Sequence, residues 1–418
     1  MEKKSSNFSG QIGFVLAAAG SAVGVGNLWR FPYLAAKDGG GLFLVIYLVL
    51  VLTFGFTLLT SDIAIGRRTG ESAIRAYTKM RKKWKFLGIL TFLVPVLIMT
   101  YYAVIGGWVT KYAVVYLTGQ AQAAAADDYF TSFITSPVAP VVFALLFMGV
   151  TSFIVYNGVE GGIERVSKYM MPILLVLVVI IAGYSLTLKH TDEAGQLRTG
   201  IEGFLYYLTP HFEGLTVGRF FQILLDAMSQ LFFSLSVSMG IMITYGSYVK
   251  PEVNLNRAVN QIEIFDTGVA LLAGAMIIPA VYVFSGTEGM SAGPSLMFVS
   301  LPKVFAAMGK AGNVVGILFF VTTIFATLTS CISVLESITA NCMEIFHTGR
   351  KKTVLVLTVI YLTASAVIAL GYSIFYFEVK LPNGSTGQLL DIMDYISNSF
   401  MMPLISLLST ILIGWIVT

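Results

Sequence analysis

The chain has 418 residues, of which 56% are apolar and 11% are charged, and its mean hydropathy is +0.82. That charged fraction is less than half of the roughly 25% found in soluble domains, too little to cover a water-soluble fold of this length. The 26 basic and 22 acidic residues leave a net charge of +4. These numbers exclude an ordinary soluble protein and favour an integral membrane protein.

Two further functional classes are disfavoured by where the reactive residue types lie. The basic residues cluster in short loops and form no stripe or tail that tracks nucleic acid. Cys331 and Cys342 share one apolar stretch, which supports neither a disulfide framework nor a cysteine metal site. His190, His211 and His347 fall in polar segments, away from any nucleophile or second histidine in the apolar regions. We therefore expect neither a nucleic-acid-binding protein nor an enzyme.

Ten apolar stretches are long enough to cross a bilayer. Helices are expected, because lipid leaves backbone polar groups unsatisfied and no alternating barrel pattern occurs. The predicted fold is one all-α membrane domain over residues 1–418, in contact with the lipid bilayer. The stretches are 12–35, 41–66, 87–118, 138–157, 167–188, 220–248, 262–285, 311–346, 353–373 and 392–417.

The basic residues predict the orientation of these spans. No signal peptide is expected, so the first stretch is retained as a membrane span. With the N-terminus in the cytoplasm, 17 basic residues lie inside and seven outside, and eight of the 17 fall between residues 67 and 85. This asymmetry is the positive-inside pattern.

The first and sixth stretches are interrupted by small or polar residues, AAAGSAVGVGN in one and SLSVSMG in the other. Each interrupted stretch begins a set of five, so the second set has the inverted topology of the first. The repeats are predicted over about residues 11–190 and 218–417. Paired interruptions in inverted repeats indicate a binding site near the bilayer midplane of a secondary transporter.

The first stretch contains the most specific pattern. Gly20 and Gly24 form a small-xxx-small pair, which by itself is typical of close helix packing. Asn27 and Arg30, one turn apart in an apolar helix, favour instead an unwound segment that offers carbonyls to a cation and amides to a carboxylate.

The sequence GSAVGVGNLWRFPYLAAKDGGGLF, residues 20–43, resembles the first-helix signature of the neurotransmitter:sodium symporter family. The resemblance covers essentially the whole chain. It implies a leucine-transporter-like bundle of 5+5 inverted repeats, with helices 1 and 6 broken. It also implies Na⁺-driven uptake of amino acids or related amines across a bacterial inner membrane, and it does not specify an oligomeric state.

The resemblance also implies roles in the sixth stretch, where serines alone would be expected to bond back to their own helix. Phe233 is expected to cover the substrate as a lid and Ser234 to bind an ion. Ser236 to Met239 are expected to form pocket wall, although Ser238 stands where the family usually has glycine.

Two Na⁺ sites follow from the same resemblance. The first is expected to share the carboxylate of the substrate, which would make ion and substrate binding cooperative. The second is expected to be an all-oxygen site without formal charge, unlike the sites of Ca²⁺ or Mg²⁺. The expected protein ligands are Ala22, Asn27, Ser234 and Asp266 at the first site, and Gly20, Val23, Ala326, Thr329 and Ser330 at the second.

The expected substrate is a neutral, hydrophobic L-amino acid, because the pocket is mostly apolar and offers a charged side chain no partner. Tyr102 matches the family tyrosine that bonds the substrate carboxylate. The full expected set is Ala22, Gly24, Gly26, Ile98, Tyr102, Phe233, Ser234, Ser236, Ser238, Met239, Ser330 and Val334.

Chloride is not expected to be required, because Asp266 supplies a negative charge and Ala270 stands where chloride-dependent members have serine. Tyr47 and Gln230, two other residues of that neighbourhood, are retained.

The gates are expected to be Arg30 with Asp394 and the lid Phe233 on the outer side, and Glu344 with Lys3 or Lys4 on the inner side. Gly162 and Pro172 have the family spacing associated with local unwinding of the fifth helix, or mark only a proline near a helix start.

Two alternatives remain open at this point. One is H⁺ coupling through Asp266 or Glu336, although Glu336 is interpreted as a hydrogen-bonded support of the broken first helix. The other is an amino-acid receptor that binds on the same scaffold without transport.

Overall fold

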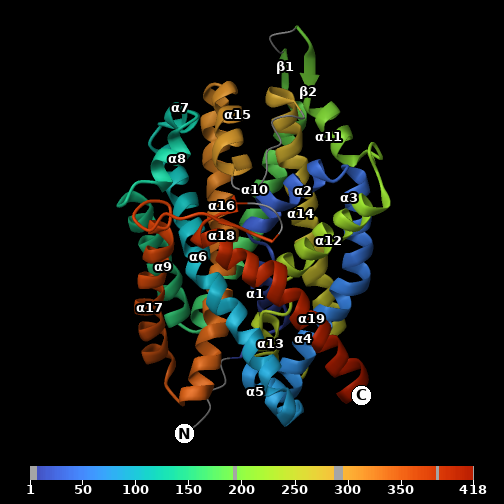
Figure 1. Cartoon of the computed structure of the whole chain (residues 1–418), viewed down its shortest axis with the longest axis vertical. Coiled ribbons are helices and arrows are strands. Elements are labelled where there is room, and N and C mark those ends of the chain that lie inside the picture. The colour runs from blue at the N-terminus through green and yellow to red at the C-terminus, as the bar shows by residue number, and fades with distance from the viewer. Residues whose placement is uncertain (1–6, 192–194, 287–294, 383–385, 418) are drawn as a thin grey trace.

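The computed structural model describes residues 7–191, 195–286, 295–382 and 386–417. The chain is an elongated bundle of helices (Figure 1), with the β1–β2 hairpin at one end and helix α5 at the other. We refer to the hairpin end as outer and to the α5 end as inner. The predicted all-α architecture is confirmed.

The regular elements of the first half of the chain are all helices. Its elements are α1 (Gln11–Ala22), η1 (Gly26–Arg30), α2 (Phe31–Lys37), α3 (Gly41–Leu50), η2 (Val51–Gly55), α4 (Phe56–Thr69), α5 (Ala73–Met80), η3 (Lys82–Trp84), α6 (Lys85–Leu117), α7 (Ala121–Ala124), α8 (Tyr129–Ile134), α9 (Ala139–Tyr156), η4 (Val159–Glu164) and α10 (Arg165–Thr187).

The second half begins with the antiparallel hairpin β1 (Lys189–Thr191) and β2 (Leu197–Thr199). Its other elements are α11 (Gly200–Leu208), α12 (Val217–Ser234), α13 (Ile241–Ser247), α14 (Leu255–Ser285), η6 (Leu296–Ser300), α15 (Leu301–Ala307), α16 (Lys310–Phe346), α17 (Arg350–Leu370), β3 (Val379–Lys380), β4 (Thr386–Gly387), α18 (Leu389–Asp394), η7 (Tyr395–Met401), α19 (Met402–Ile411) and η8 (Leu412–Val417).

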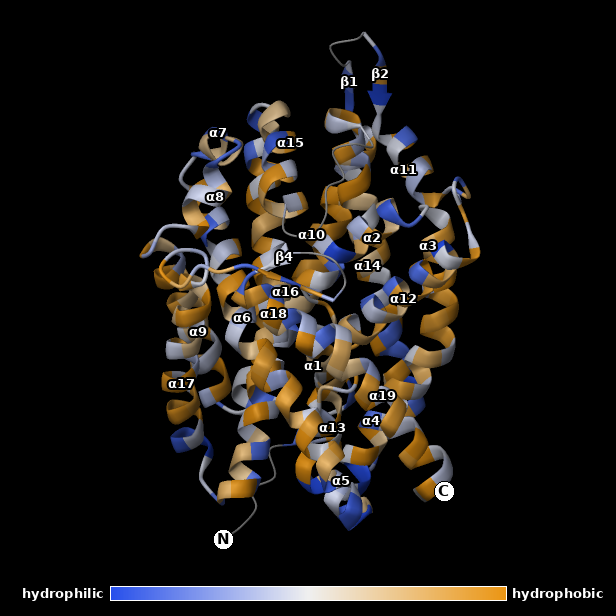
Figure 2. Cartoon of the chain, in the orientation of Figure 1, coloured by the Kyte–Doolittle hydropathy of each residue, from blue (hydrophilic) through white to orange (hydrophobic). Residues whose placement is uncertain are grey.

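Within the described residues, eight helices are long and apolar enough to span a membrane, and a bent pair forms a ninth span. That pair is the first predicted stretch, Gln11–Ala22 and Gly26–Lys37, bent by 54°. The sixth predicted stretch is divided into α12 and α13 by six residues, 235–240, outside regular helix. Figure 2 shows hydrophilic residues gathered at the hairpin and at α5, with apolar residues on the helices between them.

The loops carry structure that the hydropathy pattern did not predict. Helix α5 lies in the basic inner loop, and a shorter apolar helix, Leu296–Ala307, lies between α14 and α16. Helix α11 begins with a capping box, in which Thr199 and Glu202 bond each other's backbone amides.

The second break is made by backbone conformation. Ser236, Ser238 and Gly240 all have positive φ, at 52°, 64° and 73°, which a continuing right-handed helix excludes. The broken helices lie against each other, because η1 contacts α12 and α1 contacts α13. The two breaks therefore meet in the middle of the bundle.

The inner half of the second broken helix packs closely on α4. A Cβ on Gly66 would lie 1.8 Å from the carbonyl oxygen of Ile243, and a Cβ on Gly246 would lie 2.3 Å from that of Ile63. Only glycine permits this approach, so α4 and α13 touch backbone to backbone.

Candidate functional site: a cavity between two broken helices

A small cavity of about 20 Å³ lies between the two helix breaks, in the interior of the bundle. One wall comes from α6 and α16 and the other from the broken helices. Its lining residues are Ser21, Ala22, Gly24, Asn27, Ile98, Tyr102, Phe233, Ser236, Met239, Ser330 and Val334. Of these, Ser21 was not predicted, because a serine among alanines and glycines carries no sequence signal of its own.

A larger cavity of about 360 Å³ lies on the outer side of the first, lined by Arg30, Trp108, Asp391 and Asp394 among others. Tyr102 and Phe233 line both cavities. A Cβ on Gly26 would lie 2.7 Å from the Phe233 ring, so the ring rests directly on the glycine backbone. Phe233 thus lies between the two cavities.

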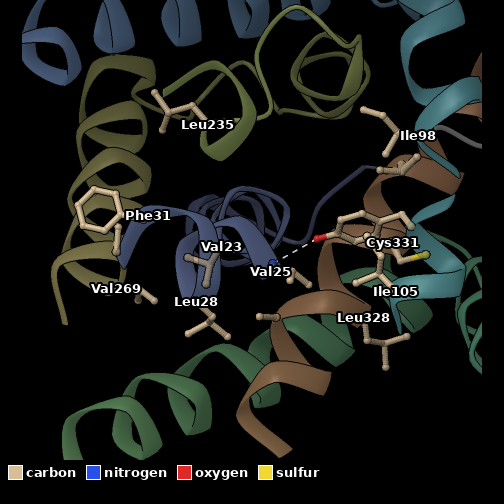
Figure 3. Packing of buried hydrophobic residues seen from close by; sticks show 14 of the residues in the cluster. Val23, Val25, Leu28, Phe31, Ile98, Ile105, Leu235, Val269, Leu328 and Cys331 are labelled. Carbon is tan, nitrogen blue, oxygen red and sulfur yellow. Dashed lines mark hydrogen bonds between the residues drawn. The ribbon is translucent and has the colours of Figure 1, made fainter. Parts of the chain in front are cut away.

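The phenol of Tyr102 reaches the first helix break. The backbone nitrogen of Val25 donates a 3.3 Å hydrogen bond to Tyr102 Oη (dashed line in Figure 3), and a Cβ on Gly24 would lie 2.8 Å from the same oxygen. Gly24 therefore leaves room for a polar group between the phenol and the start of η1, where helix amides lack intrahelical acceptors.

Asn27, Ser234 and Asp266 form a closed polar cluster beside this cavity, and all are fully buried or nearly so. Asn27 Nδ2 donates to Asp266 Oδ1 at 2.8 Å and to Ser234 Oγ at 3.0 Å, while Ser234 Oγ donates to both carboxylate oxygens of Asp266. Asn27 Oδ1 accepts from the backbone nitrogen of Gly24 at 3.1 Å. Asn27 Nδ2, which carries a partial positive charge, thus partly compensates the charge of the buried Asp266 carboxylate.

A second group of oxygens converges at the end of α1, where the last carbonyls of a helix have no intrahelical donor. Ser330 Oγ lies 3.3 Å from the carbonyl oxygens of Gly20 and Val23 and 3.1 Å from that of Ser21. Thr329 Oγ1 lies 3.2 Å from the carbonyl oxygen of Ala326. The structure thus brings the Ser330 hydroxyl to the carbonyls of Gly20 and Val23, and it places Thr329 Cβ 3.1 Å from where a Cβ on Gly20 would stand.

Ser234 and Ser238, although predicted to contact substrate, point away from the small cavity. Ser234 faces Asp266, and Ser238 Oγ lies 2.5 Å from Ser406 Oγ of α19. The Ser238 backbone nitrogen donates to Asp62 of α4 at 2.9 Å. Asp62 was not predicted as a functional residue, although a carboxylate inside an apolar span is a sign of one.

Several buried polar atoms near Asp266 have no hydrogen-bond partner within the described residues: Tyr47 Oη, Gln230 Oε1 and Glu263 Oε1. Glu263 lies one helical turn before Asp266 and is 6% exposed. Glu263 was also missed, and its oxygen lies 2.8 Å from where a Cβ on Gly55 would stand. Two buried carboxylates therefore lie on neighbouring turns of α14.

The predicted outer pair faces a common cavity without direct contact among the hydrogen bonds and ion pairs of the described residues. Arg30 Nη2 donates to Ser229 Oγ at 2.8 Å. Asp394 Oδ1 accepts from Tyr101 Oη at 3.0 Å and from Asn398 Nδ2 at 2.6 Å. Both side chains line the larger cavity.

The expected inner-gate carboxylate, Glu344, lies at the start of α5. Glu344 accepts hydrogen bonds from the backbone nitrogen and hydroxyl of Ser72, the residue immediately before α5, because amides at a helix start need an acceptor. Lys3 and Lys4 lie outside the described residues.

The interpretation of Glu336 as a support of the first helix was wrong. Glu336 is held by both guanidinium nitrogens of Arg350, at 2.5 and 2.7 Å, and by Tyr248 Oη at 2.7 Å. A guanidinium satisfies a buried carboxylate with two parallel bonds.

The fifth helix is wound in this structure. Gly162 lies in η4, and α10 continues through Pro172. Of the two interpretations left open for this spacing, local unwinding is thus not the conformation seen.

Comparisons with known proteins find similar proteins along the whole length of the chain. The profile described as "Sodium:neurotransmitter symporter family" matches residues 5–133 and 134–418. An uncharacterized sodium-dependent transporter of Bacillus subtilis, YhdH, is 37% identical over 84% of this chain and 75% of its own length. The human sodium- and chloride-dependent GABA transporter 2 is 23% identical, over 100% of this chain and 75% of its own.

The crystal structure of MhsT in complex with L-phenylalanine has the same fold. The two structures superpose with a TM-score of 0.85 at 36% identity, over 98% of this chain and 90% of that one. The architecture is thus the leucine-transporter-like bundle with two broken helices. The family profile matches essentially the full length of the chain. Members of that family are multi-pass membrane transporters and not enzymes. The chain belongs to the sodium:neurotransmitter symporter family.

Proposed function

We propose that the chain imports neutral, hydrophobic L-amino acids by Na⁺-coupled symport and alternating access. The observation that carries this proposal is the cavity between the two helix breaks, with the Asn27–Ser234–Asp266 cluster on one side and the oxygens around Ser330 on the other. The complex of MhsT with L-phenylalanine supports an amino acid as substrate. The membrane would be the bacterial inner membrane, with the N-terminus in the cytoplasm.

The substrate carboxylate would bind between Tyr102 Oη and the amides at Gly24 to Gly26, where the half-helix beginning at η1 favours negative charge. Its side chain would lie among Ile98, Met239 and Val334, all of which are 4% exposed or less. That environment has no countercharge, so charged side chains would be rejected. Ser236 and Ser330 would supply the polar edge of the pocket.

The first Na⁺ would bind to Ala22, Asn27, Ser234, Asp266 and the substrate carboxylate. The amide of Asn27 now directs Nδ2 at Asp266, so ion binding would turn its oxygen inward and release the Gly24 amide for the substrate. Rotation of the Asn27 amide would thus prepare both the ion site and the substrate site, which is the physical basis for coupled binding. The second Na⁺ would lie among the carbonyls of Gly20, Val23 and Ala326 and the hydroxyls of Thr329 and Ser330.

Proton coupling is the second candidate, and one observation favours it. Glu263 has a buried oxygen without a partner, and Asp266 lies on the next turn, so both carboxylates cannot remain charged without a cation nearby. Glu336 suits this role poorly, because Arg350 already neutralises it.

Uptake of radiolabelled neutral amino acids into proteoliposomes separates these functions. We expect accumulation with an inward Na⁺ gradient and none when K⁺ replaces Na⁺ at matched pH. Accumulation in both media would contradict Na⁺ coupling and support proton coupling, and binding without accumulation would indicate a receptor. Replacing chloride by gluconate is expected to leave uptake unchanged, since Ala270 offers no hydroxyl to an anion.

A further inference from the structure

A groove of about 600 Å³ lies at the inner end of the bundle, apart from the two cavities described above. It is formed where α5 and the beginning of α6 meet the end of α16, and these three helices contact one another. None of the residues that line it lines either of the other two cavities. The groove is therefore a separate feature and not part of the proposed substrate site.

Basic side chains form the polar side of this groove, and they come from α5 and α6: Arg75, Lys79 and Lys85. Arg75 Nη2 lies 3.3 Å from His347 Nε2, and Lys79 Nζ donates to a backbone carbonyl at 2.7 Å. Neither partner is a carboxylate. The Lys85 ammonium has no hydrogen bond or ion pair with any residue that the structure describes. All three cations can therefore turn toward a ligand.

The nearby acidic residues do not neutralise this charge. Glu71 is the one acidic residue that lines the groove, and Glu344 behind it already accepts hydrogen bonds from Ser72. The residues after α5 add further positive charge, because residues 81–83 are all basic and exposed. The groove thus favours an anion.

The other side of the groove is apolar and opens toward the surface that faces lipid. Ile74, Ile89 and Ile345 line it, and the last two are 40% and 38% exposed. Phe86 and Leu93 lie on the same face of α6 as Ile89 and are 47% and 39% exposed. A stripe of exposed apolar side chains therefore runs from the groove along a helix long enough to span the membrane.

The basic side of the groove lies where this span begins. Lys85 is the first residue of α6, and the apolar span that contains it runs from Lys82 to Leu117. The ring of Trp84 lies 5.5 Å from that of Phe86. Tryptophan and lysine are typical of the boundary between hydrocarbon and water. The basic groups therefore lie at the depth of lipid phosphates, with the apolar stripe at the depth of the acyl chains.

We propose that this groove binds an anionic glycerophospholipid, with the phosphate among Arg75, Lys79 and Lys85 and an acyl chain along Ile89 and Leu93. The charge alone would suit any phosphate, but the apolar stripe that continues the groove favours a lipid. A bound lipid would link α5 to α6, because its phosphate would take donors from both helices. The inference goes beyond the proposed function and does not depend on transport.

Competition for a labelled lipid tests the proposal. Radiolabelled phosphatidylglycerol is bound to the immobilised full chain in detergent, and unlabelled lipids with the same acyl chains are added. Phosphatidylglycerol is expected to displace the label at roughly tenfold lower concentration than zwitterionic phosphatidylcholine, because the basic groups bind only net negative charge strongly. Equal displacement by the two lipids would overturn the proposal.

A pair of substitutions locates the binding. Arg75→Gln with Lys85→Gln is expected to weaken phosphatidylglycerol binding by about tenfold or more, since each basic residue near a membrane surface contributes roughly fivefold. Lys82→Gln with Lys83→Gln is the matched control, because it removes the same charge from exposed positions that do not line the groove, and it is expected to bind within about twofold of wild type. Equal weakening by both pairs would overturn the proposal.

Two further results would assign the groove to another occupant. If the first pair does not fold, Lys85→Gln alone is expected to weaken binding about fivefold, and unchanged binding would overturn the proposal. Millimolar inorganic phosphate should displace no more lipid than potassium chloride of equal ionic strength, and greater displacement would indicate a site for free anions. A chain that binds no phosphatidylglycerol, and whose dimer is lost in Arg75→Gln with Lys85→Gln, would make the groove an interface between copies.

Discussion

The carboxylate of Asp62 accepts a 2.9 Å hydrogen bond from the backbone nitrogen of Ser238, in the middle of the second helix break. Asp62 is 4% exposed, and Ser238 has a φ of 64°. A broken helix leaves amides without partners inside the membrane, and a side chain from α4 satisfies one of them. The break is thus stabilised by its neighbours and not by its own sequence alone.

Substitutions at Ser238 should separate backbone strain from the hydroxyl contact. Ser238→Ala loses the bond to Ser406 and keeps the left-handed conformation, so we expect a loss of about 1 kcal/mol. Ser238→Gly loses the same bond but relieves about 1 kcal/mol of strain and should be close to wild type. Thermal unfolding in detergent measures both, and equal melting temperatures for the two variants would contradict the argument.

Gly24→Ala should abolish amino-acid binding. The added methyl would lie 2.8 Å from Tyr102 Oη and 3.0 Å from Ser330 Oγ, where the carboxylate is proposed to bind. Gly183→Ala is the control, because nothing lies within 4 Å of a Cβ at this exposed helical position. Binding of the labelled neutral amino acid that wild type accumulates compares the purified variants, and binding by Gly24→Ala at wild-type affinity would place the substrate elsewhere.

Asp266→Ala should weaken Na⁺-dependent binding by roughly tenfold to a hundredfold, because it removes the charged acceptor that Asn27 and Ser234 share. Asp266→Asn keeps the size and should lose less. The Na⁺ concentration that gives half-maximal amino-acid binding is the measurement. An unchanged value in Asp266→Ala would remove this residue from the ion site.

The pair of Glu336 and Arg350 should respond asymmetrically to mutation. Arg350→Met leaves a buried carboxylate facing Tyr248 without its cation, and we expect a loss of about 3 to 5 kcal/mol. The double variant Glu336→Gln with Arg350→Met should recover a large part of that loss. Denaturant or thermal unfolding of the single and double variants tests this, and strictly additive effects would contradict coupling between the two.

The sequence was most informative where helix-breaking residues and polar residues occur together in an apolar stretch. Gly20 to Asn27 combine helix breakers with polar groups in an apolar run, and the structure places them at the first break, as the pattern predicts. The inverted repeats over about residues 11–190 and 218–417 stay a prediction. The roles of the ion and substrate residues also await the experiments above.

Long-range partners could not be predicted in the same way. Glu344 caps α5, a helix in a loop where no helix was predicted, while its expected partners Lys3 and Lys4 lie outside the described residues. Asp62 and Glu263 are carboxylates in apolar spans, which is a signal of importance, yet neither was predicted. Which atoms they contact depends on how distant helices pack, and a hydropathy pattern contains no such information.

The glycine contacts between α4 and α13 have a mechanical consequence. Gly66 and Gly246 leave no gap in which one helix can slide on the other, since each backbone rests on the opposing carbonyl. We therefore expect α4 and α13 to move together as one rigid body, hinged at the irregular stretch 235–240. The distance between a spin label on α4 and one on α13 should stay constant during turnover. The distance between labels on α12 and α13, on either side of the hinge, should change.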